Sequence, residues 1–243
     1  MTPEVKEALV DPALLAACYE ALHASGWSDE ILRPYLYHET DTILRTRGLS
    51  KRYGTATILT NLDLDIHRGV ILGITAGTAH GKTILCNLLC GIIKPDAGTI
   101  EIAETNTYNP LVPSLIPTLI GYSMQHPSFY PELTIKDNLK HYLSIFGREA
   151  ELTRLAESLD LIRFQNIIAD NISPGVQRRL DIALAIANHP RLLILDEPFT
   201  ELDNTEIHTI WNILTDLRTT GTTIVVTTKH PETLLHCDRI ITL

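Results

Sequence analysis

The sequence predicts an α/β fold in which a mostly parallel sheet carries helices on both faces. Short apolar runs, such as Leu192 to Leu195 and Ile224 to Val226, alternate with stretches of helical periodicity from about residue 42 onward. Strands that alternate with helices in this way form parallel sheets covered on both sides. The chain has 243 residues, of which 44% are hydrophobic. That is enough for one large domain, or for one domain with a small appendage.

The expected elements follow each other in a regular order. Strands are expected at 42–47, 56–66, 70–75, 99–103, 118–124, 191–195, 222–228 and 239–243. Helices are expected from Lys82 to about Cys90, over 133–170 with breaks near Gly147 and Asp160, and over 176–188 and 204–218.

Residues 1–38 predict a separate helical extension. Thr2-Pro3 and Asp11-Pro12 each place a capping side chain before a proline at the first helical position. Acidic residues outnumber basic ones in this segment. Two roles remain open for it. It is either a docking element for a partner or a few helices packed on their own domain.

Charge and composition exclude several classes of protein. The net charge of −9 argues against non-specific nucleic-acid binding, so no nucleic-acid partner is expected. No apolar run approaches the roughly 20 residues that cross a bilayer, and no secretory signal is visible. A cytoplasmic location is therefore expected. The cysteines, which show no Cys-x-x-Cys spacing, are expected to be reduced thiols: Cys18, Cys86, Cys90 and Cys237.

The turn between the strand at 70–75 and the helix from Lys82 has the composition of a phosphate-binding loop. Backbone N–H groups at a helix N-terminus attract a phosphate, and the helix dipole favours the anion. Lys82 supplies a cation for the β- and γ-phosphates, and the Thr83 hydroxyl can ligate Mg²⁺. The nucleotide-binding residues expected here are Ala76, Gly77, Thr78, Ala79, His80, Gly81, Lys82, Thr83 and Ile84.

Two adjacent carboxylates end the apolar strand at 191–195. A surface pair of acids would not normally terminate a buried run, whereas a strand's carboxyl end is where a metal and a reacting water are held. We assign Asp196 to Mg²⁺ and Glu197 to the attacking water, as general base or orienting group.

With these two motifs the chain resembles the ABC ATPase family from about residue 44 to its end. The resemblance implies a P-loop NTPase (RecA-like) core with an antiparallel β-subdomain and a helical subdomain at about 126–175, all within 39–243. It implies ATP and Mg²⁺ as ligands. Within the chain's own half-site, Tyr53 matches the family's adenine-stacking aromatic residue, and Gln125 matches the glutamine that senses Mg²⁺ and the γ-phosphate.

The resemblance also implies a site shared between two subunits. Ile172 to Val176 stands where the family's Leu-Ser-Gly-Gly-Gln signature contacts the γ-phosphate across the interface, through Ser173, Gly175 and Val176. Asp203 lies in the loop that crosses to the other subunit.

His230 follows a Thr-rich strand, as the family's γ-phosphate histidine does. Counting from Gly221 puts that histidine at Lys229, and counting back from Cys237 puts it near Thr228. A one-residue bulge is therefore expected if His230 is used.

Other positions depart from the family pattern. Ala76 replaces the first loop glycine, and Ala79-His80 replaces Gly-Ala or Gly-Ser. If the family's backbone at residue 79 needs a positive φ, alanine carries a strain of about 1 kcal/mol. In the signature, Pro174 has no N–H to donate and Val176 replaces a polar side chain. The chain's own half-site is thus expected to be intact and its contribution to a partner weakened.

The function expected from the resemblance is an ATP-hydrolysing ABC transporter subunit, peripheral on the cytoplasmic face of the membrane. It would pair with a second ATPase subunit and drive a separate transmembrane permease. Residues 126–147 look most like exporters of the drug, antibiotic and peptide type. Two alternatives stay open: a soluble ABC-type ATPase that is not a transporter, and a slow or regulatory nucleotide-binding subunit.

Overall fold

The computed structural model describes residues 42–76, 79–102, 105–106 and 119–243. Residues Thr42–Leu243 form one compact unit. The helical extension expected at 1–38 lies outside the described residues, as do Gly77 and Thr78 of the loop. The domain boundary expected at residue 39 stays a prediction.

A four-stranded antiparallel sheet has the strand order β2-β1-β4-β5. It contains β1 (Thr42–Tyr53), β2 (Ala56–His67), β4 (Ala97–Ile102) and β5 (Thr105–Asn106). The strand expected at 42–47 is too short, because β1 runs on to Tyr53. Register shifts after Thr46 interrupt its alternation of buried and exposed side chains, which hid the continuation from the sequence pattern.

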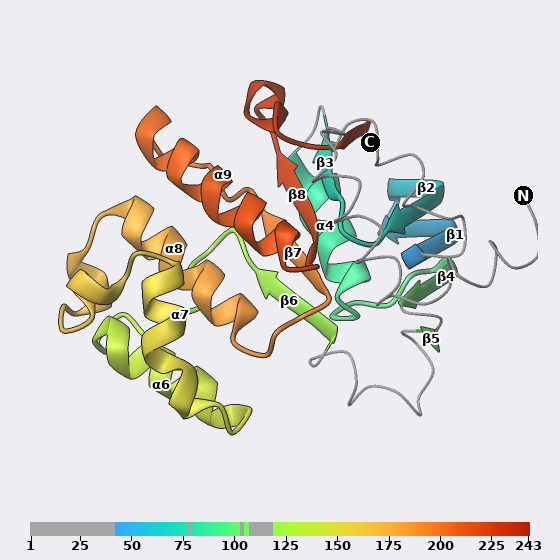
Figure 1. The fold of residues 1–243 in the computed structure, drawn as a ribbon. Helices are drawn as coiled ribbons and strands as arrows, with labels where there is room; N and C mark the ends of the chain where they lie inside the picture. The colour runs from blue at the N-terminus through green and yellow to red at the C-terminus, as the bar shows by residue number, and fades with distance from the viewer. Residues whose placement is uncertain (1–41, 77–78, 103–104, 107–118) are drawn as a thin grey trace, which may run out of the picture. The chain divides into compact units, whose positions relative to one another are not determined.

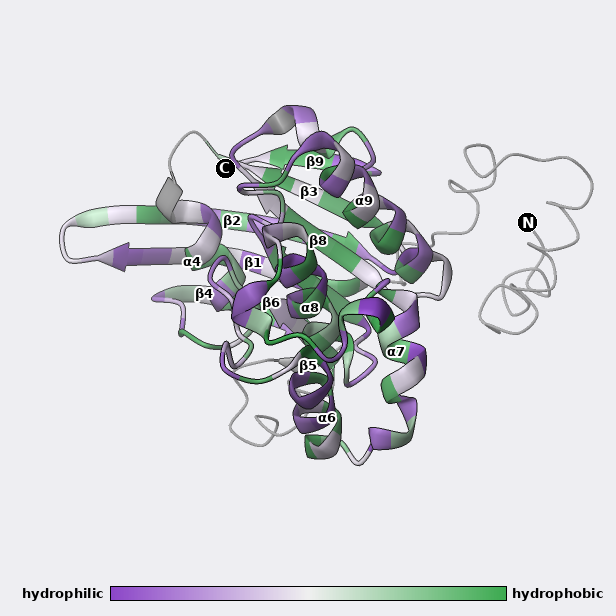
Figure 2. Cartoon of the chain, turned by 90° about the vertical axis from the view of Figure 1, so that its left-hand side faces the viewer, coloured by the Kyte–Doolittle hydropathy of each residue, from purple (hydrophilic) through white to green (hydrophobic). Residues whose placement is uncertain are grey.

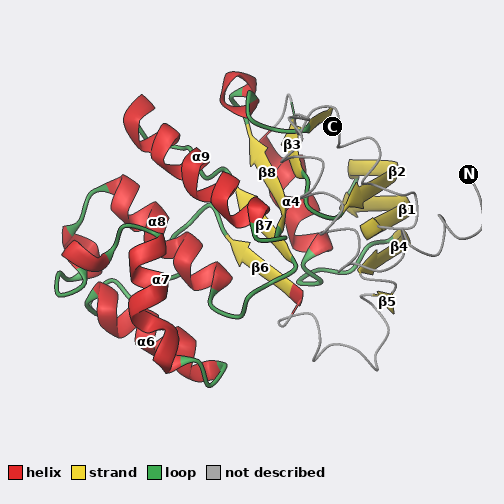
Figure 3. Cartoon of the chain, in the orientation of Figure 1, coloured by secondary structure: helices red, strands yellow, loops and turns green. Residues whose placement is uncertain are grey.

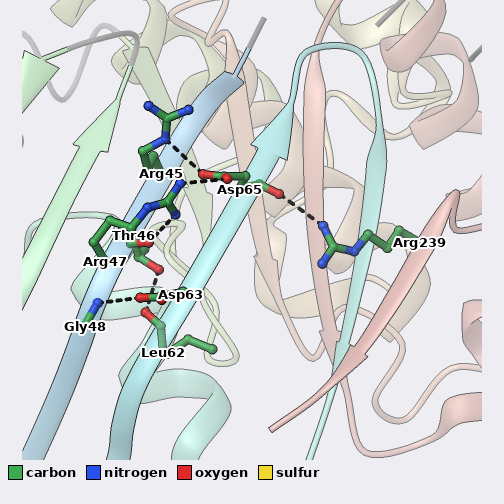
Figure 4. A network of polar contacts seen from close by, with 8 residues as sticks. All are labelled: Arg45, Thr46, Arg47, Gly48, Leu62, Asp63, Asp65 and Arg239. Carbon is green, nitrogen blue, oxygen red and sulfur yellow. Dashed lines mark hydrogen bonds and ion pairs between the residues drawn. The ribbon is translucent and has the colours of Figure 1, made fainter. Parts of the chain in front are cut away.

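Asp65 of β2 connects this sheet to neighbouring strands (Figure 4). Its carboxylate accepts from Arg45 Nε at 3.0 Å and from Arg47 Nη2 at 2.8 Å, and the hydrogen bond from Arg47 lowers the pKa of Asp65. Its main-chain oxygen accepts from Arg239 Nη1 at 3.2 Å. Since Arg239 begins β9 of the other sheet, this residue links the two sheets at their edges.

The second sheet has five strands in the order β6-β7-β8-β3-β9, and all of its pairings are parallel (Figure 1). This confirms the predicted fold class. The strands are β6 (Ile120–Ser123), β7 (Leu192–Asp196), β8 (Thr223–Thr228), β3 (Ile71–Thr75) and β9 (Arg239–Thr242).

The helices lie close to their predicted positions. They are α4 (Ala79–Leu89), α6 (Ile135–Ile145), α7 (Leu152–Ser158), α8 (Pro174–Ile186) and α9 (Asn204–Thr219), with short 3-10 turns at Glu149–Glu151, Ile162–Phe164, Ala169–Asn171 and Pro231–Leu234. The expected breaks occur at Gly147 and Asp160, both with positive φ. Figure 3 shows α6 and α7 gathered at one end of the unit and the antiparallel strands at the other.

The parallel sheet separates two hydrophobic cores. Leu192 and Ile194 of β7 join α4 and the antiparallel sheet in one core. Leu193 and Leu195 face the other core, which contains α6, α7, α8 and α9. Successive side chains of a strand point to opposite faces, so helices on both sides keep every residue of β7 buried. Strands β3 and β8 are likewise largely apolar, as their green colour in Figure 2 shows.

The described helices include none that combines the length and the apolar character of a bilayer-crossing segment. Three of the four cysteines are described, and all three are free thiols. Burial raises the pKa of the Cys86 thiol well above its usual range and that of Cys237 to about 12, so both stay protonated.

Candidate nucleotide-binding site

The parallel pairing brings the carboxyl ends of four strands to one edge of the sheet. Ser123 pairs with Leu195, Asp196 with Thr227, and Thr75 with Thr228. The residues that follow these ends are Ala76, Met124, Glu197 and Lys229. In open α/β sheets this edge is where ligands bind. The segments that follow these four strands, which carry Lys82, Gln125, Glu197 and His230, therefore meet at one edge of the sheet.

Lys82 and Glu197 form a buried ion pair at the centre of this edge. Lys82 Nζ lies 3.3 Å from Glu197 Oε1, and the two side chains are only 1% and 8% exposed. Lys82 sits in the first turn of α4, where backbone N–H groups have no intrahelical acceptors. A phosphate that binds this helix end therefore meets both the ammonium and the carboxylate.

Thr227 of β8 holds the neighbouring carboxylate. Its Oγ1 donates to Asp196 Oδ1 at 2.6 Å, with both residues fully buried. The second oxygen, Asp196 Oδ2, is buried and has no hydrogen-bond partner among the described residues. A buried carboxylate oxygen without a donor is costly unless a cation satisfies it, so this atom fits a Mg²⁺ ligand.

The other expected Mg²⁺ ligands are oxygen donors as well. Thr83 is partly exposed in the first turn of α4, and Gln125 is exposed just beyond β6. The described residues hold no cluster of three or more His, Cys, Asp or Glu side chains. A hydroxyl, an amide and one carboxylate suit Mg²⁺, which keeps waters and shares phosphate oxygens rather than sitting in a protein cage.

Glu197 has an unusual backbone. Its φ is +52°, which costs a non-glycine residue about 1–2 kcal/mol. Its N–H donates to Thr227 O at 3.1 Å, and its Oε2 accepts from Lys229 N at 3.1 Å. These contacts turn the side chain back over the strand end toward Lys82, although the strand's alternation would point it elsewhere.

Helix α4 begins at Ala79, three residues before the expected start at Lys82. The strain considered for an alanine at position 79 stays a prediction. Gly81 is buried, and Ile84 packs partly against the core beneath the loop.

Gln125 presents its side chain to solvent while its main chain is held. Arg178 Nη1 of α8 donates to Met124 O at 3.0 Å, and Nη2 donates to Gln125 O at 3.4 Å. Just beyond, Ser128 N donates to the buried Asp181 Oδ1 at 2.8 Å. The expected sensor is therefore fixed at its backbone and free at its amide.

His230 lies at the rim of the site. Strand β8 keeps its parallel register with β3 up to Thr228, where the pairing ends. The chain then turns so that Lys229 N reaches Glu197 Oε2. The bulge expected if His230 is used stays a prediction. The imidazole of His230 is 51% exposed and its Nδ1 lies 3.2 Å from Glu232 Oε1. The backbone N–H of His230 donates to Thr228 Oγ1.

Tyr53 is remote from the strand ends. It closes β1 at the β1–β2 turn, where it pairs with Ala56, and its ring is 51% exposed. Lys51 Nζ lies 5.5 Å from the ring centroid. An exposed aromatic face beside a cation can stack on a base, as the sequence predicts, but no described contact brings Tyr53 to Lys82.

The signature segment forms the N-terminus of α8. Ser173 is the N-cap, and its Oγ accepts from Val176 N at 3.4 Å. Pro174 occupies the first helical position, where an N–H would have no intrahelical partner. This explains why α8 begins two residues before the expected 176. The hydroxyl proton of Ser173 and the N–H of Gly175 remain as donors, while the Val176 side chain is buried.

Gly175 packs against the first turn of α9, which directly follows the loop expected to cross to the other subunit. A side chain at this position would overlap the carboxylate of Glu206, in the first turn of α9. Glu206 forms a capping box with Asp203, the N-cap of α9, whose Oδ1 accepts from Glu206 N at 2.8 Å. The two segments expected to face a partner subunit therefore touch each other within one chain.

Sequence reasoning missed three side chains around the site. Thr227 was noticed only as part of a Thr-rich strand, and its bond to Asp196 depends on the strand register. Arg178 and Asp181 follow the signature motif and are buried. Their spacing in the sequence did not predict this burial. A charged pair inside an apolar helix was the available signal.

The fold and the site define a P-loop nucleotide-binding protein. A family model described as ABC transporter matches residues 59–200, so this chain belongs to the ABC transporter family and carries its ATP-binding domain.

Among curated proteins, the Nod factor export ATP-binding protein I of Rhizobium etli is 33% identical over 208 residues, 83% of this chain and 65% of the relative. The daunorubicin resistance ATP-binding protein DrrA3 of Streptomyces coeruleorubidus is 32% identical over 197 residues, 79% of this chain and 62% of the relative. The chain thus spans less than two thirds of the length of these relatives.

Among solved structures, a dimeric bacterial ABC transporter cassette is 27% identical with a TM-score of 0.74, covering 82% of this chain and 94% of the other. A nucleotide-free cassette is 22% identical with a TM-score of 0.75, covering 83% of this chain and 87% of the other, and this second likeness concerns the fold alone.

Proposed function

We propose that this chain is the ATP-hydrolysing subunit of an exporter-type ABC transporter, working with a second ATPase subunit and a separate transmembrane permease. The observation that carries the proposal is the buried Lys82–Glu197 pair beside Asp196 at the carboxyl edge of the parallel sheet. This arrangement offers a cation to phosphate and a carboxylate to water within one small space.

Each residue has a distinct task in this proposal. Lys82 and the first turn of α4 bind the β- and γ-phosphates. Thr83, Asp196 and Gln125 would hold Mg²⁺, which would supply positive charge to the phosphate oxygens. Glu197, released from Lys82 by the phosphate, accepts a proton from the attacking water. Its Oε2 bond from Lys229 N keeps it oriented while Oε1 acts.

The second half of the site comes from a partner. Ser173 and Gly175 stand at a helix N-terminus that no described residue of this chain's own phosphate site contacts, which suits donation in trans. The dimeric cassette among the similar structures supports this pairing, whether the partner is a copy or a different subunit.

A surface for the permease lies beside the Gln125 segment. Main-chain bonds join Leu133 to Tyr130 and to Ala169, and so bring two stretches of the helical region together. Several large apolar side chains here are exposed: Met124, Tyr130, Leu133, Ile167 and Ile168. Exposed apolar side chains gathered on one face suit a protein partner. The names of the curated relatives, which concern export and drug resistance, favour an export role.

Replacing Glu197 by Gln tests the catalytic part. An active enzyme should lose at least about a hundredfold in phosphate release, keep ATP binding, and accumulate as an ATP-bound dimer in size-exclusion chromatography. Glu157→Gln, which changes an exposed carboxylate of α7, is the control. A wild-type chain without turnover, unchanged by Glu197→Gln, would instead favour the regulatory subunit. Co-purification with the product of a neighbouring permease gene separates a transporter from a soluble ATPase.

A further inference from the structure

Two charged side chains are buried in the first half of α8, one turn apart. Arg178 is 9% exposed and Asp181 is 2% exposed. Charged residues are rarely buried this deeply unless they are paired and hydrogen-bonded. Residues spaced by three lie on one face of a helix, so both point to the same neighbour.

That neighbour is the segment that follows β6. Arg178 donates to the main-chain oxygens of Met124 and Gln125 at 3.0 and 3.4 Å. Asp181 Oδ1 accepts from both the N–H and the hydroxyl of Ser128, at 2.8 and 3.0 Å. All these bonds fasten one short stretch of backbone to α8.

Burial of these two charged groups is unfavourable, although Arg178 and Asp181 attract each other. Burial lowers the pKa of Arg178, although the attraction of Asp181 opposes this, and burial raises the pKa of Asp181 to about 6. The groups that face Asp181 are Arg178 on its own helix, Ser128 on the segment, and Tyr142 of α6, which donates to Ser128 O at 2.7 Å. An apolar pair of similar volume would avoid this cost of burial.

The same helix carries the signature at its start. Gly175 precedes Arg178 by one turn, and α8 is continuous from Pro174 to Ile186. A hydrogen-bonded α-helix moves as a unit over such a short distance. A displacement of the segment around Gln125 would therefore carry Ser173 and Gly175 with it.

We propose that Arg178 and Asp181 are positioning residues that tie the Gln125 segment to the signature end of α8. Through them, the state of Mg-ATP in the chain's own half-site sets the position of the donors offered to the partner's half-site. The inference rests on the proposed function, because it assigns Gln125 to one half-site and Ser173 with Gly175 to the other.

The chain offers a matched control in Arg179. Its side chain is also buried, at 7% exposure, and it lies on the same helix. Its guanidinium, however, bonds to Leu159 O and to the main chain and carboxylate of Asp160, away from the Gln125 segment. Arg179→Gln therefore removes a comparable buried charge without touching the tie.

The experiment compares Arg178→Gln, Asp181→Asn and Arg179→Gln in the full chain. The first readout is the Mg²⁺ concentration that gives half-maximal ATP turnover. It should rise roughly tenfold in Arg178→Gln, since the loss of its one short bond from a charged group is worth about one decade, and stay unchanged in Arg179→Gln. Arg178→Lys should recover part of the loss, because it restores the charge without the two-pronged geometry.

The second readout is amide hydrogen exchange after addition of Mg²⁺ with a non-hydrolysable ATP analogue. In the wild type, protection should increase over both 124–128 and 173–177. In Arg178→Gln it should increase only over 124–128. If Arg178→Gln and Arg179→Gln respond identically in both readouts while wild-type turnover is normal, the positioning role of Arg178 and Asp181 is wrong and the proposed function still stands. A wild type that neither binds nor hydrolyses ATP would overturn the proposed function and this inference with it.

Discussion

The ammonium of Lys82 and the carboxylate of Glu197 lie 3.3 Å apart, and both are almost fully buried. They come from α4 and from the end of β7, two elements far apart in the sequence. Each neutralises the other in the protein interior, so the pair that we propose to act on ATP also has a structural role.

Lys82→Met should therefore destabilise the fold as well as abolish ATP binding. Removing one member of a buried pair leaves an uncompensated charge, which costs about 3–5 kcal/mol. Urea unfolding of the variant measures this loss. Adding Glu197→Gln to Lys82→Met removes the stranded charge and should recover much of it. A double variant no more stable than Lys82→Met would contradict the pairing.

Thr227→Val tests the support of the metal-binding carboxylate. The substitution keeps the shape of the side chain but removes the hydroxyl that donates to Asp196 Oδ1. Leaving a buried acceptor unsatisfied should cost about 1–3 kcal/mol of unfolding free energy. Because Asp196 also loses its orientation, the Mg²⁺ dependence of turnover should weaken. Thr223→Val, at the opposite end of β8, is the control for turnover.

Gly175→Ala should clash with Glu206, because the new methyl group would occupy the place of that carboxylate. The Glu206 side chain is flexible and can swing aside, so the cost should stay near the roughly 1 kcal/mol of the lost capping-box bond, measured by chemical unfolding. Glu206→Ala loses only part of the capping box, about 1 kcal/mol. The double variant should lose less unfolding free energy than the sum of the losses of the two single variants. Strict additivity would show that the two residues do not compete for space.

Stability should depend on pH through Asp181. Burial raises the pKa of Asp181 from 3.8 to about 6. Its contribution is therefore fully present below pH 3.8 and is lost as the pH rises through 6. Relative to Asp181→Asn, the wild type should lose on the order of 1–3 kcal/mol of unfolding free energy between pH 4 and pH 7. Unfolding both proteins in urea across this range measures it. A difference that stays constant would mean that Asp181 titrates normally.

Pro174→Gly should raise the rate of ATP hydrolysis severalfold, because it restores an N–H at the helix end offered to the γ-phosphate. The helix itself gains nothing, since Pro174 occupies the first position, where proline is favourable. Steady-state phosphate release measures the effect. Pro131→Gly, at a proline that is exposed like Pro174 and lies outside α8, is the control. An unchanged rate would remove the basis for a weakened signature.

The sequence predicted the parts of the site that depend on order along the chain. Apolar strands followed by Lys82-Thr83 and by Asp196-Glu197 placed the phosphate and metal groups at strand ends, and the parallel sheet brings them together. The distances between them depend on register. For that reason the bond between Thr227 and Asp196 could not be predicted, although Thr227 lies in one expected strand and Asp196 directly follows another.

Contacts between separate elements could not be predicted from the sequence either. The packing of Gly175 on Glu206 requires the crossing of α8 over α9, which no local pattern encodes. The position of Glu197 depends on a positive φ, which disfavours every residue except glycine and gave no sequence signal. Counting along the chain could not place His230, because the turn after Thr228 is set by Lys229 N bonding to Glu197.

The strict alternation of β7 between two cores has an evolutionary consequence. Leu192, Ile194 and then Asp196 face the side of α4, while Leu193 and Leu195 face α8 and α9. Gaining or losing a single codon in this strand would exchange the two faces and turn Asp196 away from Thr227. Substitutions can accumulate here one at a time, but length changes cannot, so the length of this five-residue strand should change far more slowly than its residue types.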